Sequence, residues 1–475
     1  MKDWVGQSAG AAPDALAIIE GRRALTYREL EREVGRAAAW LTSIGVKAGT
    51  LAGLYAPSSI ETVVMIHALI RIGAVLVPLN RRLSAPELAY QAGYVDVLIS
   101  EQNFPSDMRP NANLIDYANF RADAPAPPRE IDLNETHALM FTSGTSGKPK
   151  PAALTYGNHF YSAVASALRI GTLPDDRWLC CMPLYHMGGL SILLRCALYG
   201  TCVVLQDGFN AEQVNAAFDH ERVTLVSLVP TMLYRLIDSR ATPPPHLRMA
   251  LIGGAAATSE LVQAAQAAGF PVVTTYGLTE TASQVATQTP ERTLLKPGGV
   301  GKAVPFTEIS IVGEDSQPLP SGETGEVVVR GPTIMRGYYQ HEDATARSLR
   351  GGALHTGDLG YLDAEGDLWL VQRRSDLIVT GGENVYPAEV EAALRTHPAV
   401  RDACVVGVAH PEWGQQVAAM IVADGEISGD EIAAYLRGRL AGYKIPRIVR
   451  FAEALPLTGS GKIERKSVKA ILERQ

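Results

Sequence analysis

A nine-residue segment, 142–150, concentrates the residue types that bind phosphate. It follows an apolar run of strand length at 138–141. Glycines let backbone N–H groups approach an anion closely, hydroxyl groups donate further hydrogen bonds, and lysines neutralise charge. It is not a Walker A loop, because two residues separate Gly144 from Gly147 and no Ser or Thr follows Lys148. A plain surface turn is the alternative. We expect a phosphate-binding loop that contains Thr142, Ser143, Gly144, Thr145, Ser146, Gly147, Lys148 and Lys150.

Five further motifs follow this loop along the chain. They are Tyr276-Gly277-Leu278-Thr279-Glu280, Thr356-Gly357-Asp358, Arg373-Arg374-Ser375-Asp376, Gly381-Gly382-Glu383-Asn384 and Gly459-Ser460-Gly461-Lys462. Together with the loop, in this order, they resemble the signatures of the acyl-adenylate-forming superfamily of AMP-binding enzymes. That superfamily includes acyl-coenzyme A synthetases, luciferases and peptide-synthetase adenylation domains. One such match would be weak, whereas six in order cover nearly the whole chain.

The resemblance implies a ligase that activates a carboxylate with ATP. Attack on the α-phosphate places a pentavalent phosphorus between two anions, so positive charge and a divalent ion must gather there. By resemblance, Lys462 bridges the substrate carboxylate and the α-phosphate. Glu280 and Thr145 hold Mg²⁺, and Thr279 touches phosphate. A solvated lysine in a C-terminal loop is the alternative for Lys462.

The nucleotide site is implied in the same way. Asp358 and Arg373 match the residues that contact the ribose, and Tyr276 matches the aromatic residue that stacks on adenine. Ser375 falls at the hinge about which the small domain turns. The resemblance also assigns to the ATP and AMP site the residues Gly253, Gly254, Ala255, Thr275 and Gly277.

The acyl pocket is indicated by the segment 183–191, which reads Pro-Leu-Tyr-His-Met-Gly-Gly-Leu-Ser. No acidic residue occurs between Pro183 and Leu205, where amino-acid-activating relatives carry an Asp for the substrate ammonium. An α-amino acid substrate is therefore disfavoured. His186 matches the gating histidine of acyl-coenzyme A ligases, with a core histidine as the alternative.

Within the superfamily, the chain resembles the o-succinylbenzoate-coenzyme A ligases of menaquinone biosynthesis. The resemblance lies in the compact length, in the segment Thr155 to His159, and in the run His186 to Ser191. Such a substrate carries two carboxylates, an aryl ketone and a ring, so its pocket needs polar donors beside apolar walls. Candidate substrate residues are His159, His186, Gly188, Gly189, Ser191, Ser227, Thr231 and Thr275; candidate coenzyme A residues are Gly381, Gly382 and Glu383.

Strand-length apolar runs must position these residues. They occur at 97–100, 225–229, 249–252 and 272–275, with helix-period stretches such as 260–268 between them. This alternation indicates an α/β fold with a largely parallel sheet. Elements shorten after about residue 375: helices are expected at 387–395 and 429–440, and strands at 403–408, 417–422 and 448–451. We expect a large multi-subdomain α/β domain, 1–374, and a small mobile α+β domain, 375–475.

Composition excludes several other classes. The chain has 475 residues, 47% of them hydrophobic, and a net charge of −7, so no global basic field favours nucleic acid. The most apolar stretch, 63–79, is interrupted by His67 and Arg71 and indicates a buried helix that runs into a strand, not a membrane span. Without a secretory signal, a cytoplasmic location is expected. The five cysteines are expected to be reduced, and a homodimer is the expected assembly.

Three alternatives remain open at this point. The chain could act on another aryl or medium-chain acid with coenzyme A as acceptor, or load a carrier protein as stand-alone adenylation enzymes do. It could also bind nucleotide without catalysis, although Lys462, Glu280, Asp358 and Arg373 together argue against that. Pro151 departs from the usual glycine of the family and, lacking an N–H, stiffens the exit of the phosphate loop.

Overall fold

The chain folds into two compact units. A computed structural model describes residues 1–81, 83, 85–100, 113–117, 124–142, 149–240, 242–254, 257–373, 378–380, 383–385, 387–410, 414–437, 439–440, 442–458 and 461–474. The first unit consists of Met1–Ile309, Val329–His355 and Gly366–Leu368, and the second of Ser310–Val328, Thr356–Glu365 and Trp369–Gln475. The domain boundary expected after residue 374 and the expected hinge Ser375 lie outside the described residues.

One sheet of the first unit has the strand order β18-β8-β7-β4-β3-β5-β6. Its inner strands are parallel, while β7 and β8 form an antiparallel pair. The apolar stretch at 63–79 is indeed a buried helix followed by a strand, α3 and β4. The strands are β3 (Leu51–Tyr55), β4 (Val75–Pro78), β5 (Val97–Ser100), β6 (Asn113–Asp116), β7 (Thr136–Thr142), β8 (Lys150–Thr155) and β18 (Gly337–Tyr338).

The other sheet of this unit has the order β15-β14-β13-β12-β11-β9-β10-β1-β2. Its strands from β1 through β13 pair in parallel, and β2, β14 and β15 are antiparallel additions at the two edges. The strands are β1 (Leu16–Glu20), β2 (Arg23–Thr26), β9 (Arg177–Cys180), β10 (Cys202–Leu205), β11 (Leu225–Leu228), β12 (Met249–Ile252), β13 (Val272–Leu278), β14 (Ser283–Thr287) and β15 (Lys302–Ala303). The largely parallel α/β fold expected from the sequence is confirmed.

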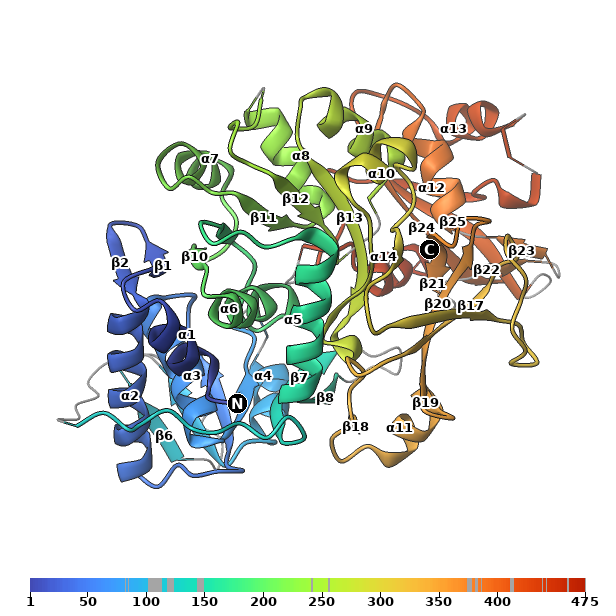
Figure 1. Cartoon of the computed structure of the whole chain (residues 1–475). Coiled ribbons are helices and arrows are strands. Elements are labelled where there is room, and N and C mark those ends of the chain that lie inside the picture. Colours follow the sequence, from blue (N-terminus) through green and yellow to red (C-terminus); the bar gives the residue numbers. More distant parts are fainter. Residues whose placement is uncertain are drawn as a thin grey trace. The chain divides into compact units, whose positions relative to one another are not determined.

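Helices cover and separate these sheets. Helix α5 contacts β8 of one sheet and β14 of the other, so it lies between them, beside α6 (Figure 1). A capping box between Thr155 and Asn158 fixes where α5 begins. The helices of the unit are α1 (Trp4–Ala11), α2 (Tyr27–Ser43), α3 (Ile60–Ile72), α4 (Ala85–Ala92), α5 (Tyr156–Ile170), α6 (Met187–Tyr199), α7 (Ala211–His220), α8 (Pro230–Ser239), α9 (Ser259–Ala267), α10 (Pro290–Leu295) and α11 (Glu342–Ser348).

Two smaller sheets complete the chain. One has the order β16-β17-β20-β19 with β21 beside β20, and the other has the order β23-β22-β25-β24 with β26 beside β25. The strands are β16 (Glu308–Val312), β17 (Gly325–Arg330), β19 (Leu349–Arg350), β20 (Ala353–Leu362), β21 (Leu368–Arg373), β22 (Ile378–Thr380), β23 (Glu383–Val385), β24 (Val400–His410), β25 (Gly414–Ala423) and β26 (Ile448–Phe451).

The C-terminal sheet is covered on both faces. Ala403 and Val405 of β24 pack with α12 (Pro387–Arg395) and α13 (Gly429–Leu436), and Cys404 and Val406 pack with α14 (Arg465–Leu472). This alternation follows from the two-residue period of a strand. The helix expected at 429–440 ends four residues early, because Arg437 takes an extended backbone conformation with ψ of 129°.

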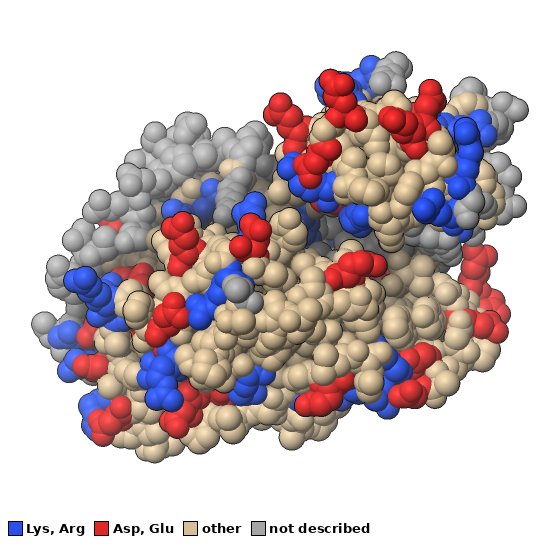
Figure 2. Space-filling model, turned by 90° about the horizontal axis from the view of Figure 1, so that it is seen from above, with Lys and Arg blue, Asp and Glu red and all other residues tan. Residues whose placement is uncertain are grey.

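The structure also bears on the expectations from composition. All five cysteines are buried and free. No helix among the described residues is long and apolar enough to cross a membrane. On the face shown in Figure 2, the described Lys and Arg side chains alternate with Asp and Glu instead of gathering into a field of one sign.

Candidate active site

The phosphate-loop segment is held by an antiparallel hairpin. Thr142 ends β7, Lys150 begins β8, and the two residues face each other in the ladder, with the Thr142 hydroxyl donating to the Lys150 carbonyl at 3.4 Å. The Tyr90 hydroxyl donates to the Pro149 carbonyl at 3.2 Å. Both ends of the segment are therefore fixed to strands of one sheet. Six expected phosphate-binding residues, Ser143, Gly144, Thr145, Ser146, Gly147 and Lys148, lie outside the described residues.

Tyr338 brings two of the predicted residues together. Its hydroxyl donates to Glu280 Oε1 at 2.8 Å, and Lys150 Nζ lies 5.7 Å from the centroid of its ring. Tyr338 can do so because β18 pairs with β8, which places it opposite Ala152. A carboxylate and an ammonium group thus lie around one tyrosine beside the phosphate-loop hairpin. A carboxylate oxygen is the ligand type that Mg²⁺ prefers, so Glu280 fits the metal-binding role.

The carboxyl ends of β12 and β13 carry the residues expected to bind the nucleotide. Gly253 approaches Thr275 so closely that an added Cβ would lie 2.8 Å from Thr275 Cγ2. Gly277 is required for a stronger reason, since an added Cβ would lie 1.7 Å from the Ser283 carbonyl oxygen. Tyr276 is buried. The Thr275 hydroxyl hydrogen-bonds to the Ala286 carbonyl and the Thr287 hydroxyl of β14. Thr279 and Glu280 follow in a short 3-10 turn, whereas Ala255 lies outside the described residues.

Helix α6 begins at the segment expected to form the acyl pocket. His186 is the N-cap residue, half-buried, with its ring 4.7 Å from the Tyr185 ring. Gly189 packs against the preceding turn: an added Cβ would lie 2.4 Å from the Pro183 carbonyl oxygen. The glycine pair Gly188 and Gly189 therefore lets the turn with His186 fold back onto the helix. Ser191, one turn later, is buried.

A polar seam runs between α5 and α6. On α6, Ser191, Arg195 and Tyr199 are four residues apart and share one helix face. Arg195 Nη2 donates to Ser162 Oγ of α5 at 3.4 Å, and the Tyr199 hydroxyl donates to the α5 backbone. His159, a predicted substrate residue, lies one turn before Ser162 and close enough to sense the Arg195 charge. The structure therefore brings two predicted residues, His159 and Ser191, to the same buried seam.

Arg195 is a buried cation whose charge is not neutralised. It is 2% exposed, no described Asp or Glu forms an ion pair with it, and its Nε has no hydrogen-bond partner. Burial lowers its pKa, yet a guanidinium stays protonated in a protein. A buried charge without a counter-ion costs several kcal/mol, so this arrangement needs a reason.

Trp178 on β9 contacts both sides of this region. Its indole Nε1–H donates to Ser227 Oγ on β11 at 3.0 Å, and the Arg195 guanidinium carbon lies 5.7 Å from the centroid of its ring. Ser227, another predicted substrate residue, is thereby linked to the seam. Thr231 lies at the start of α8, and its side chain is outside the described residues.

The histidines of the seam are neutral. Burial, with a smaller contribution from the Arg195 charge, lowers the pKa of His159 to about 3. Burial also lowers the pKa of neighbouring His137 well below its usual value, and the two rings lie 4.7 Å apart. Arg195 is therefore the charged group of this seam at neutral pH. Uncharged imidazoles can still donate one hydrogen bond each to a ligand.

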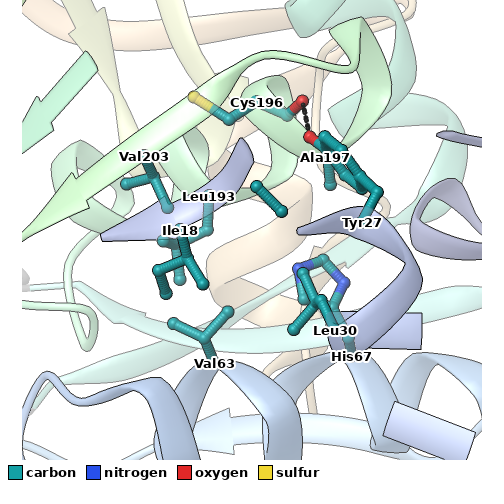
Figure 3. A pocket seen from close by; sticks show the side chains of 10 residues that line it. Ile18, Tyr27, Leu30, Val63, His67, Leu193, Cys196, Ala197 and Val203 are labelled. Atoms are coloured by element: carbon teal, nitrogen blue, oxygen red, sulfur yellow. Dashed lines mark hydrogen bonds between the residues drawn. The ribbon is translucent and has the colours of Figure 1, made fainter. Parts of the chain in front are cut away.

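Two cavities lie near α6 and the turn that precedes it. One, on the side of Leu193, Cys196 and Ala197, has a volume of about 10 Å³, at most the space of one water molecule (Figure 3). The other has a volume of about 300 Å³ and opens beside the turn with Tyr185, with Arg81 and Asp207 in its lining. The first is too small for an organic acid, and the second is at the lower limit of small-molecule sites.

The second unit carries the remaining predicted residues. Asp358 is buried and lies in the interior of β20, which continues to Leu362. Lys462 is exposed at the end of a tight loop in which the Thr458 N–H donates to the Lys462 carbonyl at 2.7 Å. The side chains of Arg373 at the end of β21 and Glu383 at the start of β23 lie outside the described residues, as do Gly381 and Gly382.

Arg195, Trp178 and Tyr338 were not predicted from the sequence. Arg195 has a detectable signal, because it is the one charged residue in the apolar helix 187–199 and follows Ser191 by one turn. Tyr338 gives no comparable signal. It reaches Glu280 across 58 positions of the chain, through a strand pairing that no local pattern encodes.

Comparison with known proteins shows the family of this chain. The family described as AMP-binding enzyme matches residues 5–339, and the C-terminal domain of AMP-binding enzymes matches residues 389–462. A 2-succinylbenzoate–CoA ligase of Bacillus cereus is 40% identical over 100% of this chain and 99% of the relative. A Bacillus mycoides protein of the same name is also 40% identical over the same shares.

Several solved structures have a fold similar to that of this chain. The o-succinylbenzoate coenzyme A synthetase of Bacillus subtilis in complex with its acyl-adenylate intermediate has a TM-score of 0.94 and 37% identity, over 99% of this chain and 98% of that one. The same synthetase with ATP and magnesium ion has a TM-score of 0.93 and 38% identity, over 99% of both chains. ATP-bound MatB of Rhodopseudomonas palustris has a TM-score of 0.93 and 26% identity, over 100% of this chain and 99% of that one. The expected adenylate-forming ligase fold is thereby confirmed.

Proposed function

Because this chain belongs to the AMP-binding enzymes, with full-length relatives that are coenzyme A ligases, we propose that it joins o-succinylbenzoate to coenzyme A. ATP first converts the acid to its acyl-adenylate with release of pyrophosphate. The thiol of coenzyme A then displaces AMP and gives o-succinylbenzoyl-coenzyme A. This product belongs to menaquinone biosynthesis.

The residues beside the phosphate-loop hairpin serve the first step. Thr142 and Lys150, with the loop between them, bind the phosphates of ATP. Glu280, whose carboxylate is oriented by Tyr338, holds Mg²⁺, and we assign Thr145 to the same ion. When bound, Mg²⁺ neutralises phosphate charge. Lys150 supplies positive charge at the same place, because its ammonium lies beside the Tyr338 ring.

We assign the adenine of ATP to the carboxyl ends of β12 and β13. Tyr276 stacks on adenine against Gly253, Gly254 and Ala255. The carboxylate of Asp358 accepts hydrogen bonds from the ribose hydroxyls, and Arg373 contacts the ribose. Lys462 bridges the substrate carboxylate and the α-phosphate, so that its ammonium offsets the charge that develops as the carboxylate oxygen attacks phosphorus.

Arg195 is the observation that carries the choice of acid. A ligand that is to be adenylated needs one carboxylate, but o-succinylbenzoate has two, and the carboxylate that does not react needs a partner. A buried guanidinium without a described counter-ion provides that partner. His159, Ser191 and Ser227 supply neutral donors nearby for the ketone and the carboxylate oxygens. A fatty acid or benzoate would leave the Arg195 charge unpaired.

The second step needs access for the thiol. We assign the approach of coenzyme A to His186 at the start of α6 and to Gly381, Gly382 and Glu383 of the second unit. In this proposal the second unit turns about Ser375 between the two half-reactions, and Lys462 leaves as the thiol enters. Such alternation lets one site serve two chemistries.

A substrate panel tests the proposal. Purified protein with ATP, Mg²⁺ and coenzyme A is given o-succinylbenzoate, benzoate or octanoate, and AMP and thioester are followed by mass spectrometry. The proposal requires o-succinylbenzoate to give the highest kcat/KM, by about a hundredfold over the monocarboxylates. A higher value for another acid would retain the ligase chemistry and reject the menaquinone assignment. AMP without thioester would point to a carrier protein as acceptor.

The cytoplasmic location and the homodimer remain predictions from the sequence. Light scattering of the purified protein tests the homodimer directly, since a dimer has twice the 50.9 kDa mass of the chain.

A further inference from the structure

We propose that Trp178 is a positioning residue for the acyl pocket, acting through Ser227 and Arg195. The inference rests on the proposed function, because it concerns how the second carboxylate of the acid is recognised. Trp178 is one side chain that contacts two groups expected to bind that acid. One contact is made by the indole N–H and the other by the ring face.

The strand that carries Trp178 makes it a rigid support. β9 lies between β10 and β11, with Trp178 paired to Val203 on one side and to Leu225 on the other. The side chain is 3% exposed, so packing restricts its rotamer. Groups that bond to this indole are therefore held in a fixed place relative to the sheet.

The hydrogen bond to Ser227 has a direction. An indole N–H can only donate, so Ser227 Oγ must accept, at 3.0 Å. The hydroxyl proton of Ser227 is then kept from pointing at the tryptophan and remains available to a ligand oxygen. Trp178 thereby leaves the Ser227 hydroxyl able to donate to a ligand.

The contact with Arg195 stabilises a charge without cancelling it. The ring quadrupole attracts a guanidinium at 5.7 Å, but it is not a counter-ion. An Asp or Glu in place of Trp178 would hold Arg195 equally well and would neutralise it. The aromatic face therefore explains how Arg195 can stay buried in the free protein and still offer its full charge to the carboxylate of an incoming acid.

The test uses ATP–pyrophosphate exchange, which reports adenylation alone. Exchange is measured with o-succinylbenzoate and with two monocarboxylate analogues, benzoylpropionate and o-butyrylbenzoate; the analogue that keeps the reacting carboxylate supports exchange. The preference is the ratio of kcat/KM for o-succinylbenzoate to that for this analogue. Trp178→Leu removes both contacts and should lower the preference about tenfold, through KM, with kcat within about twofold.

Two further variants separate positioning from packing. Trp178→Phe keeps an aromatic face below Arg195 and should keep most of the preference, which makes it the informative variant if Trp178→Leu does not fold. Trp4→Phe is the matched control, because Trp4 is also buried in the first unit and its indole N–H has no partner among the described residues. It should lower thermal stability without any change in the preference.

A double variant gives the decisive comparison. In an Arg195→Met background only the Ser227 contact remains to be lost, so Trp178→Leu should change the preference by less than about threefold. An undiminished tenfold effect in that background overturns the inference, as does a wild-type preference in Trp178→Leu. If wild-type protein gives no exchange with o-succinylbenzoate, the proposed function itself fails and the inference fails with it.

Discussion

Replacement of Arg195 by methionine should weaken the enzyme and stabilise the protein. Methionine has a similar length and fills the same space between α5 and α6 without a charge. The substrate would lose a buried, charge-assisted contact to its second carboxylate. Removing one partner of such a pair costs about 2–5 kcal/mol, so kcat/KM for o-succinylbenzoate should fall by roughly 30-fold to a few thousandfold.

The effect on folding has the opposite sign. In the free protein the Arg195 charge is buried with no acidic partner among the described residues, which costs several kcal/mol. Contact with the Trp178 ring stabilises the buried guanidinium by about 1–2 kcal/mol. The 3.4 Å hydrogen bond to Ser162 contributes little further stabilisation. We therefore expect Arg195→Met to raise the free energy of unfolding by about 1–3 kcal/mol and the thermal midpoint by several degrees.

Both quantities are measured on the same preparation, by pyrophosphate exchange and by thermal unfolding without substrate. Arg248→Met is the control, because Arg248 forms an ion pair with Asp176 at 2.5 Å. This control should lose stability and keep its KM for the acid. Arg195 is not a destabilising partner for the second carboxylate if Arg195→Met is less stable than wild type, or if its kcat/KM for o-succinylbenzoate falls less than threefold.

Three further predictions concern other parts of the site and the core. Lys462→Ala should slow adenylation by at least a hundredfold, while thioester formation from supplied acyl-adenylate falls less than tenfold; equal losses would contradict a role confined to the first step. Tyr338→Phe should raise the Mg²⁺ concentration needed for half-maximal exchange about fivefold, because Glu280 loses its 2.8 Å hydrogen bond; an unchanged Mg²⁺ titration counts against the metal role of Glu280. Burial lowers the pKa of His67 to about 4. Between pH 6.5 and 4 the unfolded chain therefore binds this proton more tightly than the folded chain does. The free energy of unfolding should fall by about 3 kcal/mol over that range. His67→Leu should flatten that part of the denaturation profile, and a profile as steep as wild type would exclude His67 as its source.

Much of the fold could be predicted because its signals are local. The expected strands at 249–252 and 448–451 and the expected helix at 387–395 have the observed bounds. Apolar runs and helix periodicity contain this information within a few residues of chain. Helix 429–440 was predicted too long, because the non-helical backbone at Arg437 lies within a segment whose composition still suits a helix.

The site was predictable only where a motif is contiguous. Glu280 was found through its motif, but Tyr338, which orients it, belongs to a different strand. His159, Ser191 and Ser227 were proposed as pocket residues from their polarity. The charge that connects them, Arg195, becomes evident only when α5, α6 and β9 pack together and none of the described acidic side chains pairs with it.

Mass spectrometry of the products is the measurement that decides whether this chain joins o-succinylbenzoate to coenzyme A with ATP. Purified protein is incubated with ATP, Mg²⁺, coenzyme A and an equimolar mixture of o-succinylbenzoate, benzoate and octanoate. We expect o-succinylbenzoyl-coenzyme A to be the dominant thioester, with one AMP formed for each molecule of thioester. Dominance of another thioester, or AMP formation without any thioester, would contradict it.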